Sequence, residues 1–235
     1  MAEIGHGYGS EFQLLRFLGH HRNEFESIIR DNSRFKRNFS WLDFPYENQR
    51  ISLDGEYKGI SFLKDHYNNY SDLEAMWKSF WPSSGNQQNW DAIFIHEDEF
   101  VLIEAKAHLK EIESECKAES EDSKKLIYSS LEKTKAHFGI KTENDWAKKY
   151  YQTANRLAFI KFLINNNIKA HLLNVYFING YIKRCPNKPI EDKSVQTEEI
   201  WREAIKKQYN YLGIVGSMAE NYITSIFVNC LPLHT

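Results

Sequence analysis

The stretch WDAIFIHEDEFVLIEAKAH, residues 90–108, holds three ionisable side chains inside what otherwise look like two apolar strands joined by an acidic turn. Asp91 belongs to the first strand, and Glu104 and Lys106 belong to the second. Side chains alternate between the faces of a strand, so Glu104 and Lys106 share one face. A tight turn at the centre of HEDE pairs residues whose numbers sum to 195, which sets Asp91 opposite Glu104.

Two carboxylates at this spacing predict a cation between them. Like charges directly across an antiparallel pair destabilise a sheet, so we expect something positive to lie between Asp91 and Glu104. Two oxygen donors suit a hard divalent metal such as Mg²⁺ or Mn²⁺, and Lys106 beside the metal is placed to orient an attacking water. An ordinary solvated hairpin is the competing interpretation, although VLIEAKA is apolar on both sides of its charges.

These residues resemble the PD-(D/E)XK nuclease superfamily, also called restriction-endonuclease-like. In that family an acid opens one strand and a (D/E)-x-K triplet lies on the next, here Asp91 and Glu104-Ala105-Lys106, with twelve residues between the two acids. Trp90 stands where the family name has proline. The resemblance implies a central mixed β-sheet flanked by helices, a metal held by Asp91, Glu104 and the Ala105 carbonyl, and a nucleic-acid substrate, DNA foremost.

The resemblance also implies an acidic residue on the helix before the hairpin. Ser10 to Gln13 has the form of a capping box, and Glu11 then shares the inward face of the helix that follows. Glu11 is therefore the candidate, with Glu24 and Glu26 as rivals. A helix N-terminal acid that interacts favourably with the macrodipole explains Glu11 equally well.

A polar cluster on a later helix supplies further candidates. Gln152 and Arg156 are four residues apart and share a helix face, and some family members place a glutamine or arginine near the active site. Gln152 is thus a candidate site residue, with the wet face of an amphipathic helix as the alternative. His108 keeps to the face of Lys106, but a half-exposed polar role at the strand end is favoured.

Helical and strand-like patterns alternate along the chain, which indicates an α/β class with a mainly covered sheet. The patterns predict helices over 71–80, 126–138, 146–164 and 198–209, and strands over 168–178 and 222–231. We expect one nuclease-like domain over 1–235, in which the charged segment and helix of 107–145 are a candidate flap, lid or specificity element, with an ordinary insertion as the alternative.

Composition limits the partners. The 30 basic and 32 acidic residues give a net charge of −2, so nucleic-acid binding would need a local basic face. Three separated cysteines without metal-ligand spacing, no leader-like start and no long apolar run favour a cytoplasmic protein without a membrane segment.

The residues leave several choices open. RNA or a branched or modified DNA remains an alternative substrate, and a homodimer is compatible with the resemblance although no heptad pattern indicates one. The alternative function is a catalytically silent module on the same fold, binding nucleic acid or a protein.

Overall fold

A mixed five-stranded sheet forms the centre of the computed structural model, which describes residues 8–42, 57–83, 87–184 and 187–230. The spatial order is β1-β4-β5-β6-β9. β1 and β4 run antiparallel to their neighbours, and β5, β6 and β9 are parallel. The strands are β1 (Phe39–Leu42), β4 (Ala92–His96), β5 (Glu99–Lys106), β6 (Ala170–Ile178) and β9 (Ile223–Asn229).

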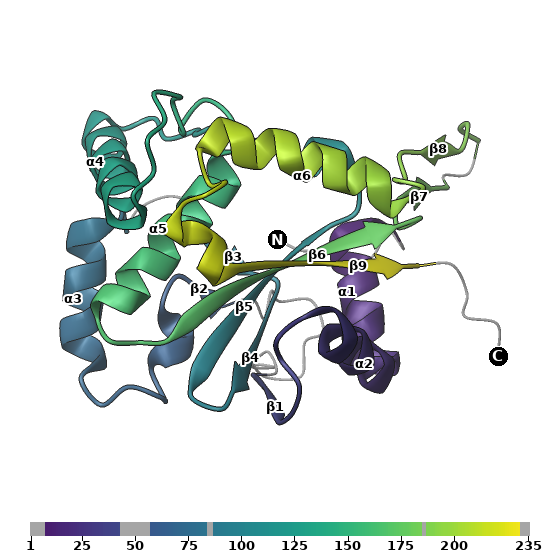
Figure 1. Cartoon of the computed structure of the whole chain (residues 1–235), viewed down its shortest axis with the longest axis horizontal. Coiled ribbons are helices and arrows are strands. Elements are labelled where there is room, and N and C mark those ends of the chain that lie inside the picture. Colours follow the sequence, from purple (N-terminus) through teal and green to yellow (C-terminus); the bar gives the residue numbers. More distant parts are fainter. Residues whose placement is uncertain (1–7, 43–56, 84–86, 185–186, 231–235) are drawn as a thin grey trace.

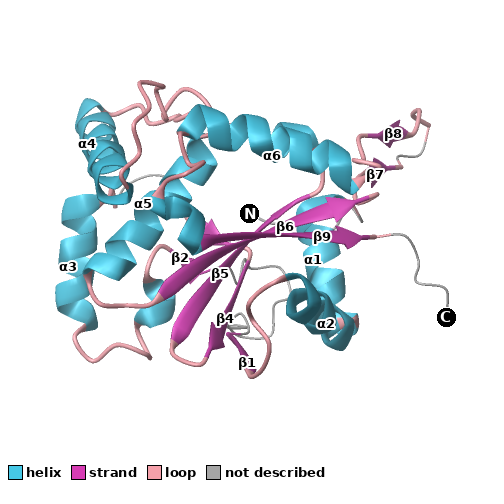
Figure 2. Cartoon of the chain, viewed as in Figure 1, coloured by secondary structure: helices cyan, strands magenta, loops and turns pink. Residues whose placement is uncertain are grey.

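Helices cover both faces of this sheet (Figure 1, Figure 2). One face is covered by α1 (Gly9–His20) and α2 (Arg22–Asn32). The other is covered by α3 (Tyr70–Phe80), α4 (Glu121–Phe138), α5 (Tyr151–Asn165) and α6 (Glu198–Leu212). The α/β class and the mixed central sheet flanked by helices are therefore confirmed.

Short elements complete the chain. Two small ladders pair β2 (Tyr57–Lys58) with β3 (Asn89–Trp90), and β7 (Ile182–Lys183) with β8 (Glu191–Asp192). Single turns of 3₁₀ helix cover Ser61–Leu63, Leu109–Glu111 and Met218–Tyr222.

The alternation of side chains along β5 divides the core in two. Leu102 packs with α3 to α6, whereas Val101, Ile103 and Ala105 pack with α1 and α2. Glu104 and Lys106 have the parity of Leu102, so they share the face that α5 covers. β6 is buried on both faces along nearly its whole length, as expected for a central parallel strand.

The β4–β5 hairpin has the register predicted from the sequence. Ala92 pairs with Ile103 and Ile93 pairs with Leu102, and each pair sums to 195. Glu97 and Asp98 form the turn, with Glu97 in the left-handed region at φ 58°. The prediction is confirmed because apolar residues on both strands are buried only in this register.

Two helix starts differ from the prediction. α1 begins at Gly9 after Tyr8, so Ser10 lies inside the helix and the predicted capping box is wrong. Gln13 instead donates from Nε2 to the Gly180 carbonyl at 3.3 Å. α5 begins at Tyr151 rather than 146, because Tyr150 adopts a left-handed conformation at φ 57° that a helix cannot contain.

The segment expected to form a flap or lid, residues 107–145, contributes to the core through α4. Ile127, Leu131 and Phe138 of α4 are buried in the larger hydrophobic cluster. The preceding coil is also held in place, because the Cys116 amide donates to the Ala147 carbonyl at 2.7 Å. Among the described residues, no helix is long and apolar enough to cross a membrane.

Candidate active site

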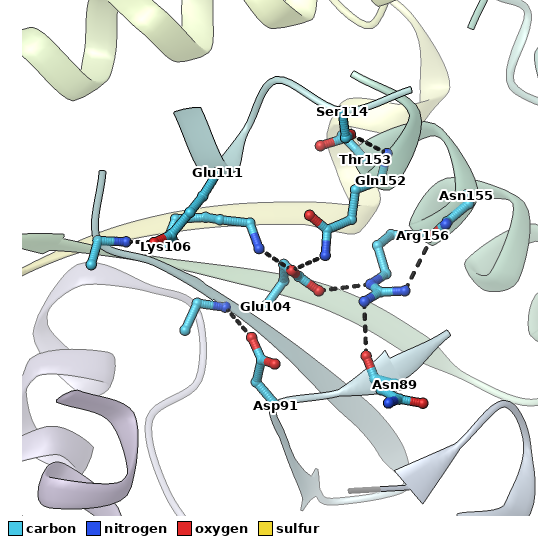
Figure 3. Close-up of polar contacts among 12 residues, drawn as sticks. Asn89, Asp91, Glu104, Lys106, Glu111, Ser114, Gln152, Thr153, Asn155 and Arg156 are labelled. Carbon is cyan, nitrogen blue, oxygen red and sulfur yellow. Dashed lines mark hydrogen bonds and ion pairs between the residues drawn. The ribbon is translucent and has the colours of Figure 1, made fainter. Parts of the chain in front are cut away.

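Asp91, Glu104 and Lys106 converge beside the start of α5 (Figure 3). Asp91 occupies a bend directly before β4, and its Oδ2 accepts the Ala105 amide hydrogen at 2.7 Å. The hairpin register and this hydrogen bond together fix the Asp91 carboxylate against β5. Glu104 and Lys106 project from β5 toward α5 (Figure 3).

Glu104 is the centre of the cluster. Its side chain is buried, with 5% exposure, yet both oxygens have donors. Oε1 accepts from Lys106 Nζ and from Gln152 Nε2, the latter at 2.6 Å, while Oε2 accepts from Arg156 Nε at 2.7 Å. The positive charge expected beside the two carboxylates is thus supplied by Lys106 and Arg156.

Arg156 contributes more to the cluster than its sequence pattern indicated. The side chain of Arg156 is 5% exposed. Its Nη2 donates to the Asn89 carbonyl at 2.8 Å, and its Nη1 donates to Asn155 Oδ1 at 3.2 Å. Its guanidinium lies 4.6 Å from the centre of the Trp90 ring. Arg156 follows Gln152 by one helical turn, so the sequence indicated that the two side chains share a helix face. The burial of Arg156 depends on what packs against α5, which the sequence does not show.

The pKa values follow from burial set against these charges. Burial raises the pKa of Glu104, but Arg156 and Lys106 outweigh it, and the net pKa is lowered. Burial lowers the pKa of Lys106, but Glu104, Asp91 and Glu111 outweigh it, and the net pKa is raised. Glu104 and Lys106 are therefore both charged at neutral pH.

Asp91 shows the opposite balance. Burial raises its pKa and repulsion from Glu104 adds to the effect, so that the pKa reaches about 7 despite opposing contributions from Lys106, the Ala105 amide and Arg156. Burial is thus the main cause of the raised pKa of Asp91, and the charge of Glu104 is the second.

The coil before α4 positions Gln152. Ser114 accepts the Tyr151 amide at its carbonyl oxygen (3.0 Å) and the Gln152 amide at Oγ (2.8 Å). These are first-turn N–H groups, which lack partners within a helix. Ser114 thus caps α5 from a distant segment, a role that no local motif in the sequence indicated.

Two other candidates have surroundings of their own. His108 contacts Glu111 (Nε2 to Oε1, 3.2 Å) and lies edge-on to Tyr181, and burial lowers its pKa. Glu11 lies in the first turn of α1, a helix whose Leu14 and Phe17 pack on the opposite face of the sheet. His108 lies close enough to the cluster for the charge of Lys106 to help lower its pKa.

The rivals of Glu11 are engaged elsewhere. Glu24 pairs with His21 at 2.6 Å, and Glu26 accepts from Arg30 and from Trp41 Nε1. None of these three contacts involves the cluster.

No protein-family model, curated protein or solved structure matches this chain. The chemistry available to the site follows from its own geometry.

The donor set suits a hard divalent cation. In the described part of the chain, no three His, Cys, Asp or Glu side chains gather where they could hold a metal ion. The available donors are thus the two carboxylates of Asp91 and Glu104 and the Ala105 carbonyl, all of them oxygens, which Mg²⁺ and Mn²⁺ prefer. Burial is the main cause of the raised pKa of Asp91, and a bound cation would lower that pKa again.

Proposed function

We propose that the protein is a divalent-metal-dependent nuclease that hydrolyses phosphodiester bonds, with DNA as the first substrate to test. The observation that carries the proposal is the convergence of Asp91, Glu104 and Lys106, two carboxylates and a lysine brought together at one buried place by a single hairpin. A purely structural cluster gains nothing from burying two repelling carboxylates.

The order of elements supports the same proposal. An acid opens one strand of a hairpin, a Glu-x-Lys triplet lies on the next strand, and a helix and a parallel strand follow. This is the arrangement that the resemblance to restriction-endonuclease-like proteins implies.

Each side chain has a role in this mechanism. Mg²⁺ or Mn²⁺ held by Asp91, Glu104 and the Ala105 carbonyl would polarise a phosphoryl oxygen and stabilise the charge that develops on it. Lys106 orients the attacking water through its ammonium hydrogens. Gln152 and Arg156 hold the two oxygens of Glu104, which fixes the direction of that carboxylate.

The test is cleavage of DNA by the purified protein with Mg²⁺ or Mn²⁺. Lys106→Ala and Asp91→Ala should each lower the rate by at least about a hundredfold, because each removes a group that acts on the reacting atoms. Lys110→Ala is the matched control, since Lys110 is exposed and near in sequence. Circular dichroism checks that each variant is folded, and undiminished cleavage by both folded site variants refutes the proposal.

One observation favours a second candidate, a catalytically silent module that binds nucleic acid or a protein. Both oxygens of Glu104 already have donors, so a cation must displace Lys106 from Oε1 or bind mainly through Asp91. Calorimetry with Mn²⁺ separates the two functions. Heat of binding at millimolar Mn²⁺ supports the nuclease, whereas no binding of metal together with tight binding of DNA supports the module.

A further inference from the structure

A cavity of about 580 Å³ opens beside the candidate active site. Its walls come from residues 81–82 after α3, residues 87–88 before β3, the coil before α4, and the first turns of α4 and α5. Gln152 and Arg156 belong both to this wall and to the cluster around Glu104. The volume lies in the range of small-molecule sites, so a ligand there would adjoin the carboxylates.

Gln88 in the cavity wall lacks hydrogen-bond partners. Its side chain is 3% exposed, and neither its amide nitrogen nor its amide oxygen has a partner. Its backbone is fixed, because its carbonyl accepts the Gly59 amide at 2.7 Å. Both atoms are buried in this structure, so the side chain has to rotate to bring the carboxamide to a ligand in the cavity, and the cost of a buried unpaired polar group favours that rotation.

The charges of the wall disfavour an anionic ligand. The three nitrogens of Arg156 donate to Glu104, Asn155 and Asn89. Lys117 is a further cation in the wall, and it is offset by Glu115 and Glu119. The cavity therefore suits a neutral group with both donors and acceptors better than a phosphate.

We infer that this cavity binds an unpaired nucleobase of the substrate, with the Gln88 carboxamide bonded to the edge of the base. A glutamine carboxamide pairs with adenine through one donor and one acceptor, so adenine is the expected base. The half-buried Tyr151 supplies ring surface in the same wall, whereas Trp81 beside it in that wall is only 3% exposed. This inference rests on the proposed nuclease function and deepens it.

The substrate class follows from this assignment. A base within a duplex is paired and stacked, so it reaches such a cavity only from a single strand or after extrusion from the helix. The preferred substrate is therefore single-stranded nucleic acid, or a site with an unpaired adenine next to the cleaved bond.

The test measures binding without cleavage. Fluorescence anisotropy in EDTA compares a short labelled oligodeoxyadenylate with an abasic oligonucleotide of the same length, which has the same phosphates and no bases. The wild-type protein should bind the adenylate at least about tenfold more tightly, since stacking and edge contacts add to binding by the phosphates. Gln88→Leu should bring this ratio close to one.

Two further variants provide a second test of the cavity and a control. Ala118→Phe places a ring in the cavity and should also remove the preference for bases. Gln208→Leu is the matched control, because Gln208 is also a buried glutamine with an unpaired amide oxygen, yet it lies outside this cavity and bonds Thr153. It should keep the wild-type ratio.

Equal binding of the two oligonucleotides by the wild type overturns the inference, as does a wild-type ratio in both folded Gln88→Leu and Ala118→Phe. The outcome is independent of the cleavage assay. A protein that prefers the adenylate but cleaves nothing has the cavity function without the nuclease function, and a nuclease without base preference has the reverse.

Discussion

Asp91 and Glu104 are both acidic and adjacent, yet their surroundings give them different properties. Lys106, Gln152 and Arg156 all donate to Glu104, whereas the described hydrogen bond to Asp91 comes from one backbone amide. The pKa values diverge accordingly, lowered for Glu104 and raised to about 7 for Asp91. Asp91 is thus the carboxylate whose charge depends on pH near neutrality.

This difference predicts how stability varies with pH. The pKa of Asp91 in the folded state lies above the ordinary value of 3.8, so the folded protein retains this proton more tightly than the unfolded chain. Its contribution to stability is complete below about pH 4 and is lost as pH rises through about 7. Asp91→Asn removes the charge, so it should raise the urea midpoint at about pH 8, and the gain should shrink toward pH 4.

Urea titrations of both proteins without added metal measure this effect. A variant less stable than the wild type at the higher pH contradicts the assignment of a buried, poorly compensated charge to Asp91.

The sequence revealed the acids more readily than their partners. Alternation along β5 and a two-residue turn are local properties, so the placement of Asp91, Glu104 and Lys106 could be predicted. The partnership of Arg156 with Glu104 spans 52 residues, and that of Ser114 with Gln152 spans 38. Such contacts depend on how α5 packs, which no local pattern encodes.

At the scale of elements, α5 depends on a neighbouring segment for its first turn. Tyr150 precedes it in a left-handed conformation and provides no side-chain cap. Ser114 accepts two of the first-turn amides instead. The coil before α4 therefore determines where α5 begins and where Gln152 lies.

Ser114→Ala should lower the free energy of unfolding by about 1 kcal/mol, as expected for a lost cap. It should also slow metal-dependent cleavage by about tenfold, because Gln152 loses its fixed position against Glu104. Thr197→Ala is the control, since Thr197 caps α6 by accepting the Ile200 amide at 3.5 Å. The control should lose stability alone. Equal rates in the two variants would count against a positioning role for Ser114.

The elements differed in how well their ends could be predicted. The strand expected over 168–178 is observed as β6 (Ala170–Ile178), because a run of branched apolar residues ends at Asn179-Gly180. The helix expected from 146 begins five residues later. Trp146 lies in the core outside the helix, and its Nε1 donates to the Leu212 carbonyl at 3.1 Å. Its apolar side chain therefore imitates the start of the helical pattern.

At the scale of the whole molecule, charge limits affinity for nucleic acid. A net charge of −2 gives no general attraction to a polyanion, and the cations of the site are already paired. The protein should therefore contact few phosphates of a bound nucleic acid.

Anisotropy in EDTA across a salt series tests this limit. Three or four phosphate contacts to a single strand give a slope of log K against log salt of about −2 to −3. A slope near about −7 would mean roughly ten contacts, and would require a basic surface that the proposal does not include.

Glu104 and Arg156 are 52 residues apart in the sequence, which also affects how the chain folds while it is being synthesised. The hairpin leaves the ribosome well before α5, so its two carboxylates repel each other with no guanidinium yet available. β5 also acquires its parallel neighbour only after the chain has crossed over through α5. Late docking of that helix is therefore the event that makes this region of the nascent chain stable, and until then the hairpin is an open template for wrong partners.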